Sequence, residues 1–386
     1  MPRTAGSRLA SIMAATALTM VSAATGCRST DQLVAINPFL SRRSAENSDL
    51  NLAEIQASYD QSLSNDHLAV LGSQLTRELI LNNYIRFMMA SRASATPDIL
   101  QGNFTSFGYF NAPSKTARNE YCKSTSKFAG AVLIGNIKNE AQSPPCGPGS
   151  STIRIPLGYS LRGFAVPSAN RFAQRLDLAA LARASQKPDG ARWSDLDPSW
   201  PKRRIRWLFS SQADFLADLR SVGIKPPARY QLAATYLSAY QNLGNHPDNL
   251  LLAPTNPGLS ATLEGARFRI LPLQTGPEGR TVAATADNLQ AYPAQLVKGL
   301  YLYLNTKSAN SCIIASFADF MLNHNATLMN ENNAIPLPPA ELRAASLTLQ
   351  NQQRSAPIGA NSPTLCKAYA EYTKRNQHTP QQAINR

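Results

Sequence analysis

The sequence predicts a mainly α-helical protein with a small β portion, an α+β fold whose helical body is built around a long N-terminal helix. The first observation is an apolar pattern between residues 49 and 92. Within it, Leu71, Leu75 and Leu79 recur at the spacing of one helix face, and either one long helix or two helices meeting near Asn65 or Gly72 fit the pattern. The second is a series of helix start and stop signals in the second half of the chain. The third is that a full hairpin pattern occurs in one stretch, 267–285.

The first 26 residues have the organisation of a secretory signal peptide. Arg3 and Arg8 give a basic start, and residues 9–26 carry no charge and consist mostly of Ala, Thr, Ser, Met and Leu. Such residues contribute little transfer energy, so the stretch is too weakly apolar for a permanent membrane span. We therefore expect export and removal of residues 1–26.

The end of this stretch, Ala24 to Cys27, resembles a bacterial lipobox, with Ala24 at a position where Leu is usual. The resemblance implies that Cys27 becomes the first mature residue and carries lipid, palmitate included. Residues 27–48 are polar and would form a flexible tether to the body. Ser22 and Ala24 also fit an ordinary small-residue cleavage site, which leaves unlipidated secretion as the alternative.

The lipobox resemblance implies a cell-envelope protein whose first partner is the membrane, through its N-terminal lipid. Arg28, at the position after Cys27, favours sorting to the outer membrane, facing the periplasm or the cell surface. The chain has 38 basic and 24 acidic residues, so we expect an anionic neighbour: a wall polymer, an anionic lipid or an envelope protein. An exported chain seldom meets nucleic acid, which we exclude as a partner. The high charge is also consistent with a basic proteome.

The five cysteines support an oxidising compartment. Lipid on Cys27 would leave four, and four cysteines allow three disulfide pairings. The shortest loops are closed by pairing Cys122 with Cys146 and Cys312 with Cys366. Each bond would stabilise the fold by about 2–4 kcal/mol.

Residues 49–386 are expected to form one mainly helical domain. Residues 97–127 have a loop-rich composition, 129–137 predict either a buried strand or a short buried helix, and 153–166 predict two short strands around Gly158 and Gly163. The later helices are expected at 171–186, 211–222, 228–244, 292–305, 310–324, 338–352 and 363–375. Gly223 is the expected end signal of helix 211–222.

The densest functional signal is a basic segment between aromatic residues. It predicts a contact with an anionic surface, because Lys and Arg bind phosphate groups and Trp favours the membrane interface. The alternative is a solvated turn whose Trp side chains pack inward beneath the Arg stems. The segment comprises Trp200, Lys202, Arg203, Arg204, Arg206 and Trp207.

Other candidate sites are weaker. A sugar-stacking groove or ordinary core packing would account for Tyr230, Tyr236, Tyr240, Tyr301 and Tyr303. A glycan-cleaving enzyme needs a pair of acidic residues, and nothing in the sequence selects two from candidates such as Glu54, Glu78 and Glu120. The four histidines lack metal-ligand spacing, and no nucleotide or catalytic motif occurs, so no metal, cofactor or catalytic residue is predicted.

The sequence therefore predicts an envelope lipoprotein that acts without catalysis, by docking or scaffolding. The alternative is a periplasmic wall-acting enzyme such as a glycan-cleaving hydrolase. Two buried carboxylates facing one cleft would favour the enzyme.

Overall fold

The structure is a computed structural model. It describes residues 67–100, 106–111, 114–123, 128, 130–137, 145–210, 212–233, 236–255, 268–275, 279–308, 311–332, 334–354 and 362–377. The signal peptide, Cys27 and the tether predicted at 27–48 lie outside these residues.

A mixed sheet of ten strands forms the framework. Eight of its strands lie in the order β2-β1-β3-β12-β4-β8-β6-β7, and β9 and β13 pair with β4 outside this order. Their bounds are β1 His67–Gly72, β2 Ser106–Asn111, β3 Gly130–Asn136, β4 Thr152–Pro167, β6 Arg206–Phe209, β7 Tyr230–Leu232, β8 Asn249–Pro254, β9 Phe268–Leu271, β12 Val297–Asn305 and β13 Ile335–Pro336. A smaller sheet contains β5 Leu176–Asp177, β10 Leu273–Thr275 and β11 Arg280–Val282.

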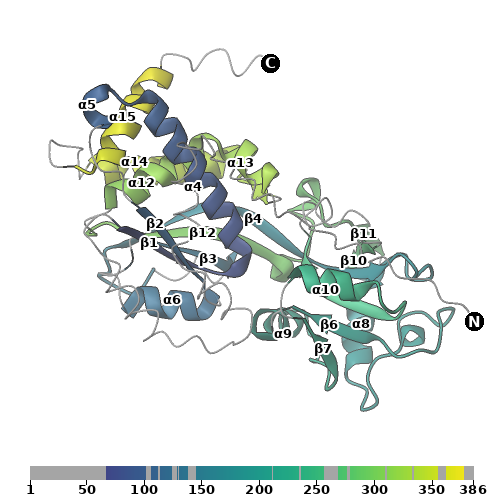
Figure 1. Cartoon of the computed structure of the whole chain (residues 1–386). Helices are drawn as coiled ribbons and strands as arrows, with labels where there is room; N and C mark the ends of the chain where they lie inside the picture. Colours follow the sequence, from purple (N-terminus) through teal and green to yellow (C-terminus); the bar gives the residue numbers. More distant parts are fainter. Residues whose placement is uncertain are drawn as a thin grey trace, which may run out of the picture.

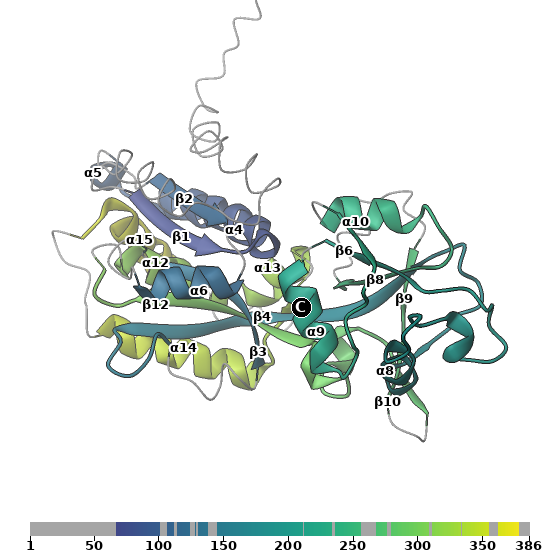
Figure 2. The same ribbon diagram turned by 90° about the horizontal axis from the view of Figure 1, so that it is seen from below.

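Helices pack against both halves of the large sheet (Figures 1 and 2). The α-helices are α4 Gln74–Ser94, α5 Pro97–Leu100, α6 Ser114–Lys123, α8 Leu178–Ser185, α9 Gln212–Ser221, α10 Tyr236–Leu243, α12 Ser311–Asn323, α13 Asn325–Glu331, α14 Pro339–Arg354 and α15 Thr364–Gln377. Short 3₁₀ turns are η1 Trp193–Asp195, η2 Ala286–Asn288 and η3 Ala294–Leu296.

The sheet is divided between two lobes that share β4. The first half of β4 pairs with β12, and its second half pairs with β8 and β9. We call the described residues of 67–160 and 298–377 the first lobe and those of 161–297 the second lobe. The two lobes lie side by side along β4 in Figure 1, joined where the chain passes out through β4 and back into β12.

Two long apolar strands make this junction possible. All nine residues of β12 are buried, and β4 is buried without interruption from Leu157 to Pro167. Strands covered on both faces read as continuous apolar runs instead of alternating ones, because each face meets a packed layer. The junction is therefore part of the hydrophobic core.

The predicted mainly α-helical class is wrong. The chain has an α/β fold with a large mixed sheet at its centre. The error has a physical origin, since a short apolar run is equally compatible with a buried helix and with a strand covered on both faces. The predicted helix at 292–305 is an example, because its second half is strand β12.

The long helix predicted at 49–92 is confirmed from Gln74 onward and wrong for residues 67–72. Residues 67–72 form strand β1, and α4 starts only at Gln74. Leu71 therefore belongs to a strand, although its spacing to Leu75 matches a helix face. Residues 49–66 lie outside the described residues.

Other differences follow the same pattern. The stretch 153–166 forms one strand and not two, and the loop-rich stretch 97–127 contains β2. The predicted helices 171–186 and 228–244 each begin with a short strand, β5 and β7 respectively, before α8 and α10. Strands β6 and β8 were not predicted at all.

Several expectations are confirmed. Residues 129–137 contain strand β3, and helices occupy most of 211–222, 310–324, 338–352 and 363–375. Gly223 ends α9 with a positive φ of 78°. Strands β10 and β11 form an antiparallel hairpin within 267–285.

Two disulfides close segments of the first lobe. Cys122 bonds to Cys146 with the Cα atoms 5.0 Å apart, and Cys312 bonds to Cys366 with the Cα atoms 6.1 Å apart. The second bond ties α15 to α12. Among the described residues, no helix is both long enough and apolar enough to span a bilayer.

Candidate functional site at the junction of the lobes

The carboxyl ends of the parallel strands of both lobes point toward the junction. In the first lobe β1 is parallel to β2 and β3, and β3 ends at Asn136 beside Lys298. In the second lobe β6 is parallel to β7 and β8, and β8 ends at Pro254 beside Arg162. Ligands of open α/β sheets bind outside the carboxyl ends of the strands. The junction is therefore the expected ligand site.

Helices start at the same strand ends. In the first lobe Ser73 precedes α4 and is buried, and the Tyr109 hydroxyl donates to the Ser73 carbonyl at 2.7 Å and lies 2.7 Å from Thr76 Oγ1. Burial raises the pKa of Tyr109, so its hydroxyl stays protonated. In the second lobe Ser210 precedes α9, and its buried Oγ has no hydrogen-bond partner among the described residues. Free N–H groups at helix starts attract anions.

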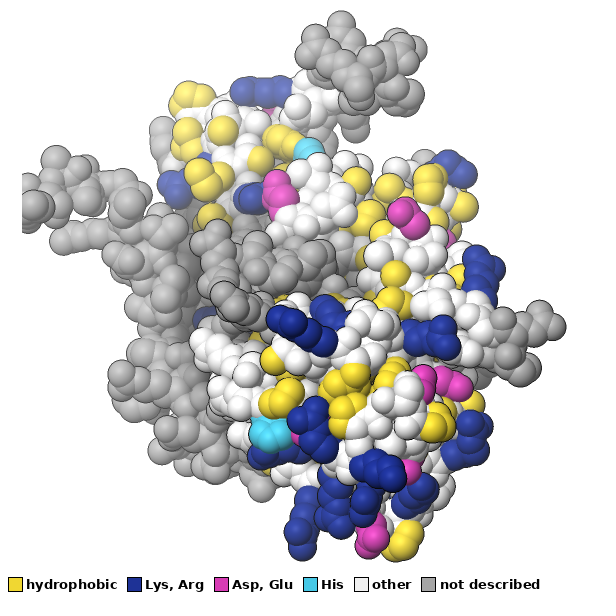
Figure 3. Space-filling view, turned by 90° about the vertical axis from the view of Figure 1, so that its right-hand side faces the viewer, with side chains coloured by type: hydrophobic (Ala, Val, Ile, Leu, Met, Phe, Trp, Pro, Cys, Tyr) yellow, Lys and Arg dark blue, Asp and Glu magenta, His cyan; other side chains and the backbone are white. Residues whose placement is uncertain are grey.

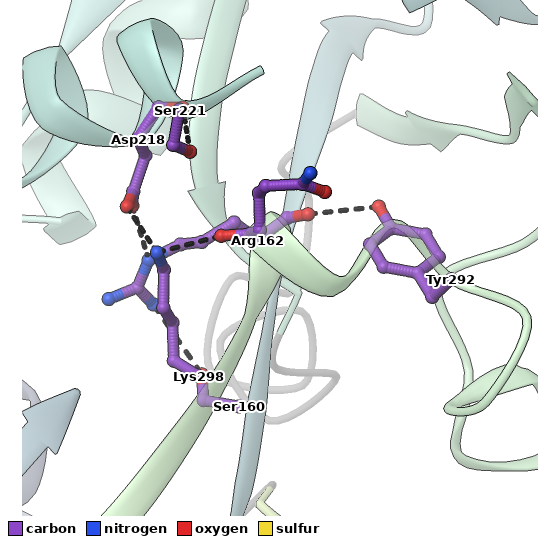
Figure 4. Close-up of polar contacts among 7 residues, drawn as sticks. Ser160, Arg162, Asp218, Ser221, Tyr292 and Lys298 are labelled. Atoms are coloured by element: carbon purple, nitrogen blue, oxygen red, sulfur yellow. Dashed lines mark hydrogen bonds and ion pairs between the residues drawn. The ribbon is translucent and has the colours of Figure 1, made fainter. Parts of the chain in front are cut away.

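Three charged side chains meet at the junction itself (Figure 4). Arg162 on β4 places Nε 3.3 Å from Oδ2 of Asp218 on α9, and Lys298 on β12 places Nζ 2.5 Å from Oδ1 of the same carboxylate. The three residues are 1%, 6% and 7% exposed in the order Arg162, Asp218, Lys298. We call them the junction triad.

The local sequence explains how the triad is positioned. Ser160 and Arg162 alternate to the same face of β4, and the guanidinium reaches back to Ser160 Oγ at 3.5 Å. On α9, Phe215 and Asp218 are three residues apart and share a face, so the Arg162 guanidinium also lies 5.6 Å from the centre of the Phe215 ring. Packing thus holds Arg162 from two sides.

Backbone hydrogen bonds fix the surroundings of the triad. The Tyr292 hydroxyl donates to the Arg162 carbonyl at 2.9 Å, and Ser221 Oγ donates to the Asp218 carbonyl at 2.7 Å (Figure 4). Lys298 Nζ also donates to the carbonyl of Gln295 at 2.8 Å. Burial raises the pKa of Tyr292, so this hydroxyl remains a donor.

The triad carries two positive charges and one negative charge. Burying an uncompensated charge is costly, and a paired arrangement of opposite charges lowers that cost. Asp218 compensates one cation, which leaves a net charge of +1 in a buried position. An anion bound at the junction would compensate the second.

Of the comparisons with known proteins, only the one with solved structures found matches. No protein-family model matches the sequence, and neither does any curated protein. Among solved structures, a putative phosphate ABC transporter substrate-binding protein with bound phosphate from Clostridium perfringens superposes with a TM-score of 0.52 and 11% identity. An ABC-type phosphate transport receptor from Vibrio cholerae superposes with a TM-score of 0.51 and 13% identity. Each covers 70% of this chain and 100% of the matched chain.

The chain shares the fold of these two proteins. This finding overturns the expectation of a docking or scaffolding protein, and equally the alternative of a glycan-cleaving hydrolase. Neither expectation anticipated two α/β lobes whose strand ends face one another.

The predicted site residues lie away from the junction. Arg206 opens β6 at the end remote from it, and the preceding segment continues along that far end of the second lobe. Lys202, Arg203, Arg204 and Arg206 are exposed, Trp200 is half-buried and Trp207 is buried. Trp207 thus packs inward while the cations stay exposed, and both interpretations of the segment remain open.

The tyrosines do not line one groove. Tyr301 and Tyr303 lie on β12 in the first lobe, whereas Tyr230 and Tyr240 lie in the second. Of the three acids considered for catalysis, Glu120 lies on α6, Glu78 on α4, and Glu54 outside the described residues. Within the described part of the chain, no group of three or more His, Cys, Asp or Glu side chains could hold a metal ion.

The junction triad was missed, although the sequence contains a signal for it. Arg162 and Lys298 are isolated cations, in the apolar runs LGYSLRGFAV and VKGLYLYL. Lys and Arg are almost never fully buried unless they are paired. A single cation inside a strand-like apolar run therefore indicates a buried ion pair. Two such runs indicate two buried cations that need a carboxylate as their counter-charge.

Proposed function

We propose that the protein is a solute-binding protein that holds a small oxyanion, inorganic phosphate or an anion of similar size, between its two lobes. The observation that carries this proposal is the junction triad with its net charge of +1, located where the strand ends of both lobes meet. The names of the two similar structures, which refer to phosphate, support the same ligand class.

The chemistry of the triad suits an oxyanion. Arg presents planar N–H donors that match carboxylate and phosphate oxygens, and Lys adds a mobile point charge. In this chain Asp218 holds both cations through its two oxygens, so their donors are oriented before the ligand arrives. Preorganisation of this kind lowers the cost of binding. Ser210 and the starts of α4 and α9 would supply neutral donors.

The proposed place of action is the periplasm. The signal peptide at residues 1–26 and the two disulfides support an oxidising compartment outside the cytoplasm. Lipid on Cys27 would tether the body through residues 27–48. Arg28 favours the outer membrane, so solute would be captured at the periplasmic face of that membrane.

Membrane fractionation tests the anchoring. Wild type should float with outer-membrane vesicles, and Cys27→Ser should move to the soluble fraction. A variant that stays membrane-bound would contradict lipid anchoring. Recovery of wild type with the inner membrane would contradict the outer-membrane assignment and favour transfer of solute to a transporter there.

Calorimetric titration of the mature chain tests the ligand. Inorganic phosphate should bind with one site per chain, and a neutral sugar should give no heat of binding. Sulfate, which has the same shape, shows whether the site distinguishes protonated from unprotonated oxyanions. Absence of binding by every oxyanion would reject the proposed function.

A further inference from the structure

The far end of the second lobe carries a row of cations built by a short β-bridge. Arg192 pairs with Arg204 in an antiparallel bridge, with the backbone N–H of Trp193 bonded to the Arg203 carbonyl at 2.9 Å. Residues directly opposite in such a bridge project to the same face, and so does the residue two positions further on. Arg192, Arg204 and Arg206 therefore share one face, and all three are exposed.

The opposite face of the same backbone is apolar. Trp193 is 0%, Ile205 7% and Trp207 5% exposed. Because these buried side chains alternate with the cations along the same backbone, the core packing fixes the backbone that carries the cations. Lys202, also exposed, lies at a bend just before the bridge, where the Arg203 N–H donates to the Pro201 carbonyl at 2.8 Å.

The neighbouring acids form their ion pairs with other cations, although Asp195 also accepts the backbone N–H of Arg192 at 2.8 Å and interacts electrostatically with its side chain. Asp248 pairs with Arg203 at 3.1 Å, and Asp195 pairs with Lys187 at 2.6 Å. Within the described part of the chain, Arg192, Lys202, Arg204 and Arg206 make no ion pair. We call these four residues the basic face. Figure 3, which views the molecule from the side of the second lobe, shows Lys and Arg side chains gathered on one part of this end.

The aromatic side chains of this end lie beneath the basic face and do not interrupt it. Trp200 is half-buried, with its ring 6.1 Å from that of the buried Trp193 and 5.9 Å from that of Phe172. The basic face therefore presents cations to the solvent, which is complementary to the negative charge of anionic lipid head groups. An acidic protein partner would also need apolar pockets for hot-spot side chains.

We propose that the basic face binds the anionic head-group layer of a phospholipid membrane and orients the second lobe on it. The proposal uses residues remote from the junction triad and does not depend on the identity of the solute.

Vesicle flotation tests the proposal with the mature chain carrying Cys27→Ser, so that no lipid is attached. Vesicles of phosphatidylglycerol mixed with phosphatidylcholine should bind the chain, and pure phosphatidylcholine should not. The triple variant Arg192→Gln/Arg204→Gln/Arg206→Gln should lower the partition coefficient by about tenfold or more at low salt. Raising NaCl from about 20 to 300 mM shortens the screening length from about 20 to 6 Å and should release the Cys27→Ser chain.

A matched control removes the same charge elsewhere. Lys307→Gln/Arg343→Gln/Arg375→Gln changes three exposed residues of the first lobe and should alter partition by less than about twofold. An equal loss in both triple variants would show a general charge effect and overturn the proposal. Equal binding of the Cys27→Ser chain to both vesicle types, or binding insensitive to salt, would overturn it as well.

Discussion

Lys298 and Asp218 meet where the two lobes join: Nζ of Lys298 lies 2.5 Å from Oδ1 of Asp218, and both side chains are buried. Lys298 lies on the strand that returns to the first lobe, whereas Asp218 lies on a helix of the second. The same carboxylate pairs with Arg162 through its other oxygen. One acid thus holds two cations supplied by the two strands that join the lobes.

Removing this acid should destabilise the fold. Asp218→Asn keeps the size of the side chain but leaves two buried cations without a counter-charge, so the free energy of unfolding should fall by about 3–5 kcal/mol. Urea denaturation measures the change. Saturating phosphate should recover part of the loss, because a bound anion would take over the compensation.

The control for this variant is Asp195→Asn. It breaks the pair with Lys187, whose side chain is 55% exposed, and should cost less than about 1 kcal/mol. Equal losses of unfolding free energy in the two variants would contradict the proposed importance of burying Asp218 between two cations.

Gly158 permits the close approach of β13 to β4. A Cβ atom at this position would lie 2.5 Å from the Ile335 carbonyl oxygen and 3.1 Å from Met329 Sδ. Gly158→Ala should therefore lower the free energy of unfolding by about 1–3 kcal/mol. Gly244→Ala, where the nearest atom is 3.7 Å away, should change it by less than about 0.5 kcal/mol. Thermal denaturation of both variants decides, and a tolerated alanine at Gly158 would contradict the packing described here.

The two disulfides should contribute unequally. Cys312 and Cys366 are separated by 54 positions, and Cys122 and Cys146 by 24. Loop-closure entropy gives about 4.2 kcal/mol for the first and about 3.5 kcal/mol for the second. Paired Cys→Ala variants compared by urea denaturation should show the larger loss for the 312–366 bond. The reverse order would show that local packing outweighs chain entropy.

His324 should make stability depend on pH. Burial lowers its pKa below the ordinary value, although nearby Asp319 opposes this shift. The unfolded chain therefore takes up a proton at a higher pH than the folded chain. As pH falls from about 6.5 toward the lowered pKa, protonation of His324 stabilises the unfolded state more than the folded state. The free energy of unfolding therefore falls.

His324→Gln should remove this loss, so the free energy of unfolding should change less between pH 7 and pH 5 than in wild type. Urea denaturation at both pH values provides the comparison. Burial also raises the pKa of Asp319, which acts in the opposite sense nearer pH 4, and Asp319→Asn should remove that opposing contribution. An unchanged pH dependence in His324→Gln would refute the assignment.

The sequence predicted helices more reliably than strands. Helix 211–222 was predicted correctly because Gly223 marks its end. The run around Leu300 was misread because β12 is buried on both faces and lacks the alternation of a half-exposed strand. Because the β12 segment was predicted to be helical, the large sheet was not predicted and the predicted fold class was wrong.

The candidate site could be predicted only in part. Arg162 and Lys298 are visible in the sequence as isolated cations in apolar runs, but their partner is not, because Asp218 occupies an ordinary position on a helix far away in the chain. The dense basic segment around Arg204 is the stronger local signal in the sequence, but it lies at the end of the second lobe remote from the junction. A local cluster of charges can be recognised in the sequence, whereas the residues of the junction triad are distant in the sequence and are brought together only by the fold.

The most direct test of the account is calorimetric titration of phosphate into wild type, Arg162→Gln, Lys298→Met and the exposed control Arg86→Gln. We expect binding to wild type and to the control, and a loss of at least about tenfold in affinity in each triad variant, since each removes a charge-assisted interaction of about 1.5–3 kcal/mol. Thermal denaturation confirms that each variant is folded. Folded triad variants that bind phosphate as tightly as wild type would contradict the central claim.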